Sequence, residues 1–117
     1  ARALLEKLRR GEELPSHQPA PAAVWQFGDD LTLVALSGEV VVDYAYRIEE
    51  ALGPRKLWVA AYCHEVFGYV PSARVRREGG YEAKGIFGKG LFAPEAEAVY
   101  VSRVRELAEQ AGRKLPE

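Results

Sequence analysis

The sequence predicts a mixed α/β fold, in which a small sheet with a hairpin and a crossover strand is flanked by amphipathic helices. Two apolar runs, Ala23–Phe27 and Leu31–Leu36, lie on either side of a Gly-Asp-Asp turn and predict a β-hairpin. Leu57–Tyr62 is a short continuous apolar run, which is typical of a strand buried on both faces. Pro94–Ala111 predicts a helix that Gly112 ends, with an apolar stripe at helical spacing formed by Tyr100, Val104, Leu107, Ala108 and Ala111. Strands that alternate with amphipathic helices indicate the α/β class.

The remaining elements follow from local signals. Leucines on one face predict a helix over Ala1–Arg10, and three prolines make Glu12–Ala22 an irregular connector. Ser37 can cap a helix that continues through Ala51. A short helix is expected over Pro71–Glu78, before Gly79. We therefore divide the chain into an N-terminal helix with its connector, residues 1–22, and an α/β portion, residues 23–117.

Composition limits the classes of function. The 117 residues suit one small domain, and the net charge of −1 provides no field that would attract nucleic acid or an anionic membrane. No stretch is long and apolar enough to predict a transmembrane segment. The single cysteine, Cys63, excludes an internal disulfide and a zinc site built from cysteines.

The chemistry-bearing residues gather in one block that follows the predicted crossover strand. Polar, aromatic and glycine residues crowd Ala61–Ser72 and Gly79–Glu82, as is typical of a site at the end of a sheet. Upstream, Glu39 follows a predicted strand, at the start of the predicted helix. Its carboxylate is explained either by the helix dipole or by metal binding at the carboxyl end of a strand. Tyr69 is explained on general grounds as a loop aromatic packed on the core.

Gly38-Glu39 and the segment Ala61–Ala83 resemble the C-terminal part of the catalytic domain of the neutral/alkaline, non-lysosomal ceramidases, especially the bacterial ones. The resemblance extends more thinly over residues 24–107. It implies a zinc-dependent amidase that hydrolyses the N-acyl amide bond of ceramide or a similar N-acyl lipid, in a secreted or periplasmic protein. In that family a Gly-Glu at the end of a strand supplies a zinc ligand, which corresponds to Glu39.

The same resemblance assigns roles to two tyrosines. It makes the Tyr69 phenol the second zinc ligand from this chain, and it places Tyr81 near the reacting amide, where a phenol can donate to the carbonyl oxygen. Arg47 also corresponds to a family arginine, whereas the segment from Val40 to Ala45 departs from the family pattern.

The resemblance places two histidine ligands and a serine nucleophile in sequence that precedes this chain. We therefore expect part of a catalytic domain, with the rest of that domain as its partner and with weak or no zinc binding by these residues alone. The alternative is a non-catalytic α/β domain in binding or assembly, with the block after the crossover strand as a partner surface.

Several other residues invite a functional interpretation. His64 has no partner at ligand spacing, and adjacent side chains on an extended segment point to opposite faces, so a Cys63-His64 nucleophile pair is not expected. His17 is expected to be solvated. The glycine-rich run over residues 85–90 lacks the spacing of a phosphate-binding loop. The basic cluster Arg74, Arg76 and Arg77 is expected to form a solvated helix face.

Overall fold

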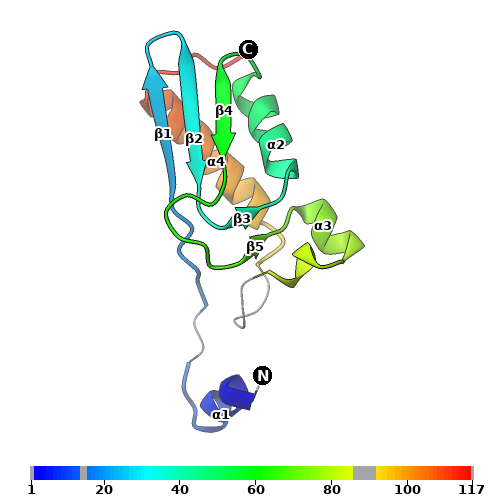
Figure 1. Cartoon of the computed structure of the whole chain (residues 1–117). Coiled ribbons are helices and arrows are strands. Elements are labelled where there is room, and N and C mark those ends of the chain that lie inside the picture. The colour runs from blue at the N-terminus through cyan, green and yellow to red at the C-terminus, as the bar shows by residue number, and fades with distance from the viewer. Residues whose placement is uncertain (1, 14–15, 86–91, 117) are drawn as a thin grey trace.

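The computed structural model describes residues 2–13, 16–85 and 92–116 and confirms the mixed α/β class (Figure 1). The elements in chain order are α1 (Arg2–Arg9), β1 (Ala22–Phe27), β2 (Leu31–Leu36), β3 (Glu39–Val40), α2 (Asp43–Leu52), β4 (Leu57–Ala60), β5 (Tyr69–Val70), α3 (Ala73–Glu78), the 3₁₀ turn η1 (Glu82–Lys84) and α4 (Ala96–Gln110).

The strands form two separate sheets. The larger has the order β1-β2-β4, and the smaller pairs β3 with β5. β1 and β2 are antiparallel, with Val24 opposite Val34, which confirms the predicted hairpin. β2 and β4 are parallel, with Val34 opposite Val59, and the chain between them contains β3 and α2. The crossover strand is therefore present, and it lies at an edge of the sheet.

Among the described residues, helices cover only one face of the larger sheet. Val34 and Leu36 of β2 are fully buried against Ile48 and Leu52 of α2 and Val104 of α4. Figure 1 shows α4 crossing behind the sheet, with α2 beside β4. On the other face the Trp58 side chain is 63% exposed, so the prediction that this strand is buried on both faces was wrong. An edge strand with one uncovered face keeps the side chains of that face in solvent.

The second helix begins five residues later than the sequence predicted. Ser37 is not its cap: the Ser37 backbone N–H donates to the Tyr100 hydroxyl at 3.0 Å, and the side chain is fully buried. Glu39–Val40 forms β3, and α2 begins only at Asp43. The run of three valines after Glu39 explains this, because β-branched side chains favour extended backbone.

The two ends of the chain differ in how they are held. In α4, Tyr100, Val104 and Ala108 are buried, in agreement with the predicted stripe, although Ala111 at its end is exposed. Leu5 and Leu8 of α1 are about half exposed, and no described residue of this helix is buried. Within the residues that the structure describes, no helix has the length and hydropathy needed to span a bilayer.

Candidate functional site

The small β3–β5 sheet lies at the carboxyl ends of β2 and β4, where α/β folds commonly carry their sites (Figure 1). Glu39 pairs with Tyr69 in the parallel register, and Val40 pairs with Val70. Because paired residues of neighbouring strands project from the same face, this register places the Glu39 carboxylate beside the Tyr69 phenol. Glu39 is therefore on a strand and not in the first turn of a helix, which removes the helix-dipole explanation for it.

Gly38 allows this small sheet to form. Its backbone has φ +76°, a left-handed conformation that favours glycine. A Cβ atom there would lie 2.7 Å from Val70 Cγ2 and 3.0 Å from the Phe67 ring. The Gly38-Glu39 pair thus has a structural reason: the glycine lets β5 and Phe67 approach the backbone that carries the glutamate.

The loop between β4 and β5 wraps around the same two residues. Gly38 N–H donates to the Glu65 carbonyl at 2.7 Å, and Glu39 N–H donates to the Gly68 carbonyl at 2.9 Å. Tyr69 N–H in turn donates to the Gly85 carbonyl at 3.1 Å. Backbone hydrogen bonds hold Glu39 and Tyr69 in place, while the neighbouring Phe67 and Val70 side chains pack into the core.

Five polar side chains meet at this point. The Tyr62 hydroxyl donates to Glu39 Oε1 at 2.5 Å. The Tyr69 and Tyr81 rings meet edge to face, with centroids 5.4 Å apart, and the Lys84 ammonium lies 4.4 Å from the centroid of the Tyr81 ring. The three residues that the family resemblance singled out, Glu39, Tyr69 and Tyr81, are therefore neighbours in space. We refer to them, together with Tyr62, as the Glu39 cluster.

Tyr62 was missed in the sequence. It lies in the right block, immediately after the crossover strand, but no spacing rule connects it with a glutamate 23 residues earlier. Only the wrapping of the loop around Gly38 brings the two side chains together.

The pKa values of two phenols beside Glu39, those of Tyr62 and Tyr69, lie above the ordinary value. The hydrogen bond to Glu39 raises the pKa of the Tyr62 phenol. Partial burial, followed by the negative charge of Glu39 and a hydrogen bond to it, raises the pKa of the Tyr69 phenol. Without a cation, both tyrosines therefore act as hydrogen-bond donors to the carboxylate.

The donor set fits part of a metal site. Carboxylate oxygen is an ordinary zinc ligand, and a phenol becomes one when the cation displaces its proton. Over residues 2–13, 16–85 and 92–116, no group of three or more His, Cys, Asp or Glu side chains is arranged to hold a metal ion. The Glu39 cluster can thus offer a carboxylate and a phenolate, and a complete site needs further ligands.

The remaining sequence candidates lie outside this cluster. His64 and His17 are exposed, and His17 bonds with Ser16, as expected of a solvated side chain. The Cys63 thiol donates to the backbone carbonyls of Ala60 and Ala61. In the glycine-rich run, residues 86–90 lie outside the described residues, so the expectation that it is no phosphate-binding loop stays a prediction.

The basic cluster is only partly solvated. Arg74 forms a two-point ion pair with Asp43, with Nη2–Oδ1 and Nε–Oδ2 distances of 2.8 and 3.0 Å. The Ser72 hydroxyl also donates to Asp43. Arg74, followed by Ser72, holds the pKa of Asp43 below its ordinary value. Arg76 turns inward, since its Nη1 atom is buried, so the expectation of a uniformly solvated face was wrong for this residue.

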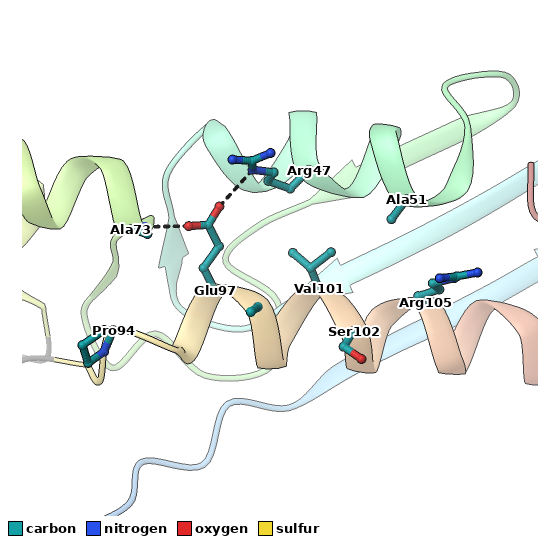
Figure 2. A pocket seen from close by; sticks show the side chains of 9 residues that line it. Arg47, Ala51, Ala73, Pro94, Glu97, Val101, Ser102 and Arg105 are labelled. Atoms are coloured by element: carbon teal, nitrogen blue, oxygen red, sulfur yellow. Dashed lines mark hydrogen bonds and ion pairs between the residues drawn. The ribbon is translucent and has the colours of Figure 1, made fainter.

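Arg47, the other residue that matches the family, has a structural partner. Its Nε donates to Glu97 Oε1 at 3.2 Å, and the other oxygen of Glu97 accepts from the Ala73 N–H at the start of α3 (Figure 2). These bonds join α2, α3 and α4 beside an open hollow of about 490 Å³. Glu39, Tyr69 and Tyr81 are not among the residues that line it, so Arg47 belongs to a different surface from the Glu39 cluster.

Comparisons with protein-family models, with curated proteins and with solved structures found no match to this chain.

Proposed function

We propose that this chain contributes one side of the active site of a zinc-dependent amide hydrolase similar to the neutral/alkaline ceramidases. The observation that carries the proposal is the register of β3 and β5, which pairs Glu39 with Tyr69 and leaves Tyr81 against the Tyr69 ring. These residues are spread over about a third of the sequence. Their meeting at the end of the sheet fits a shared chemical role better than three independent packing roles.

In this proposal Glu39 and Tyr69 hold the zinc ion together with histidines from the rest of the catalytic domain. Bound zinc supplies the positive charge that polarises an amide carbonyl and activates the attacking group. Tyr81 donates a hydrogen bond to the carbonyl oxygen as negative charge develops on it. Its side chain is 61% exposed, so a substrate can reach it. The substrate class is an N-acyl lipid such as ceramide.

The test uses the complete polypeptide that contains this chain, loaded with zinc and supplied with an N-acyl sphingoid lipid. Glu39→Gln and Tyr69→Phe are expected to weaken zinc binding in competition with a chromogenic chelator. Tyr81→Phe is expected to keep the zinc and to lower kcat by about 10²–10³, the usual effect of removing a hydrogen-bond donor to a developing oxyanion.

Matched controls come from helix α2. Glu49→Gln and Tyr46→Phe change the same atoms on exposed positions outside the cluster and are expected to behave as wild type. Wild-type zinc affinity and lipid hydrolysis in Glu39→Gln would overturn the proposal. So would stoichiometric, tightly held zinc in the 117-residue chain alone, because two protein ligands do not make a tight zinc site.

A further inference from the structure

Tyr62 has an unusual backbone for a large side chain. It follows β4 with φ +59°, in the left-handed region, and His64 adopts φ +61° two residues later. Residues other than glycine, asparagine and aspartate rarely occupy this region, and such strained conformations persist only where the surroundings enforce them. A bulky residue held in this way is a reason to ask what its side chain does.

The surroundings that enforce the conformation are the same residues that carry Glu39. The Tyr62 N–H donates to the Gly38 carbonyl at 3.1 Å, and the Cys63 N–H donates to the Leu36 carbonyl at 2.9 Å. The left-handed turn thus folds the chain back over the end of β2. These backbone hydrogen bonds fix the position of Tyr62 relative to Glu39 independently of any contact that its side chain makes.

The side chain then reaches the carboxylate. The phenol is 59% exposed overall, yet its hydroxyl donates to Glu39 Oε1 at 2.5 Å. The bond holds the carboxylate through one oxygen, and β3 and β5 hold the residue itself beside Tyr69. The strand pairing thus sets the position of Glu39, and the Tyr62 phenol acts directly on one oxygen of its carboxylate.

We propose that Tyr62 is a positioning residue, whose phenol orients the Glu39 carboxylate for a metal ion through a hydrogen bond to one of its oxygens. This inference rests on the proposed function, since it takes Glu39 as a zinc ligand. Ligating carboxylates are commonly held by outer hydrogen bonds of this kind, and loss of such a bond weakens metal binding by about 10–100-fold. Tyr62 does not itself bind the metal or the substrate.

The experiment measures zinc affinity by chelator competition in the complete polypeptide that contains this chain. Tyr62→Phe removes only the hydroxyl, and its zinc dissociation constant is expected to rise by about 10–100-fold, with little change in melting temperature. Tyr46→Phe, an exposed tyrosine of α2, is the matched control and is expected to keep wild-type affinity.

A second variant separates the phenol from the loop. Tyr62→Gly removes the phenol but suits the left-handed backbone, so the loop is expected to keep its path. If the phenol orients Glu39, the glycine variant binds zinc as weakly as the phenylalanine variant or more weakly. If Tyr62 only shapes the loop, the glycine variant keeps wild-type affinity, and the inference is overturned.

Zinc binding by Glu39→Gln separates the role of Tyr62 from the proposed zinc site on which that role rests. Wild-type affinity in Tyr62→Phe together with weak binding in Glu39→Gln overturns the role of Tyr62 and leaves the zinc site standing. Wild-type affinity in both variants overturns the zinc site and the role of Tyr62 together.

Discussion

The β1–β2–β4 sheet rests on a layer of two helices, whereas the β3–β5 pair is held by loops at the end of that sheet. In the first region, fully buried side chains such as Leu36, Ile48 and Val104 provide the core. In the second, two residue pairs, a left-handed glycine and several backbone hydrogen bonds position the Glu39 cluster. Stability therefore comes mainly from the first region, whereas the candidate site lies in the second, a division that is common because binding sites tolerate strain and exposed polar groups.

The largest expected effect comes from the core. Ile48 is completely buried between α2 and the sheet, and Ile48→Ala is expected to lower the free energy of unfolding by about 2–5 kcal/mol through the lost burial and the cavity left behind. Urea denaturation of the 117-residue chain measures it. Val99→Ala, at a position that is 66% exposed on α4, is the control for alanine substitution in a helix.

If the core and not the Glu39 cluster stabilises the fold, a substitution in the cluster should leave the free energy of unfolding almost unchanged. Glu39→Gln preserves the shape of the side chain and is expected to change the free energy of unfolding by no more than about 0.5 kcal/mol. A loss at Glu39 as large as that at Ile48 would show that the cluster stabilises the fold, and the division between the two regions would fail.

The second largest effect is expected where the two regions join. Gly38→Ala places a Cβ atom 2.7 Å from Val70 Cγ2 and puts a side chain on a backbone with φ +76°. We expect a cost of about 1–3 kcal/mol, together with displacement of β5 from β3. In a two-dimensional NMR spectrum, resonances of residues 67–70 should shift while those of β1 stay in place. Gly28→Ala, in the hairpin turn with open space around it, separates the strain of a left-handed backbone from the steric clash.

A smaller effect depends on pH. The Arg74 ion pair and the Ser72 hydrogen bond hold the pKa of Asp43 below its ordinary 3.8. A carboxyl group with a lowered folded pKa adds stability that is present above 3.8 and is lost as the pH falls through the folded value. Asp43→Asn is therefore expected to lower the melting temperature by a few degrees at neutral pH, and the difference from wild type should shrink below pH 3.8. A difference that stays constant down to strongly acidic pH would contradict this explanation.

The fold was largely predictable because its signals are local. The hairpin follows from two apolar runs around Gly28, and α4 follows from the spacing of Tyr100, Val104 and Ala108. The start of α2 was mispredicted because a capping serine and a run of valines compete. The buried bond between Ser37 and Tyr100, which lie 63 residues apart, is tertiary information that no local pattern contains.

The candidate site was predictable in a different way. Glu39, Tyr69 and Tyr81 came from a family resemblance, and spacing alone would not have proposed a phenol as a ligand. Neither the family resemblance nor residue spacing pointed to Tyr62. Its contact with Glu39 depends on a left-handed turn that no residue of the sequence predicts. Contacts that depend on the path of an irregular loop have no periodic signal in the sequence, so sequence patterns do not predict them.

The last prediction compares the two faces of the larger sheet, and the smallest effect is expected on the exposed one. Trp58 and Val59 are neighbours on β4, and they point to opposite faces. Val59 packs against the helix-covered core, whereas the Trp58 side chain is 63% exposed. Threonine suits a strand at either position, so the two substitutions compare the exposed face with the face that packs on the core.

Trp58→Thr is expected to change the free energy of unfolding by no more than about 0.5 kcal/mol, and Val59→Thr to cost about 1–3 kcal/mol because it brings a hydroxyl into an apolar layer. Guanidinium denaturation of both variants at low protein concentration measures the difference. If Trp58→Thr costs as much as Val59→Thr, then the outer face is covered in solution. A cost that grows with protein concentration would identify the cover as a second copy of the chain, because only an intermolecular contact depends on concentration.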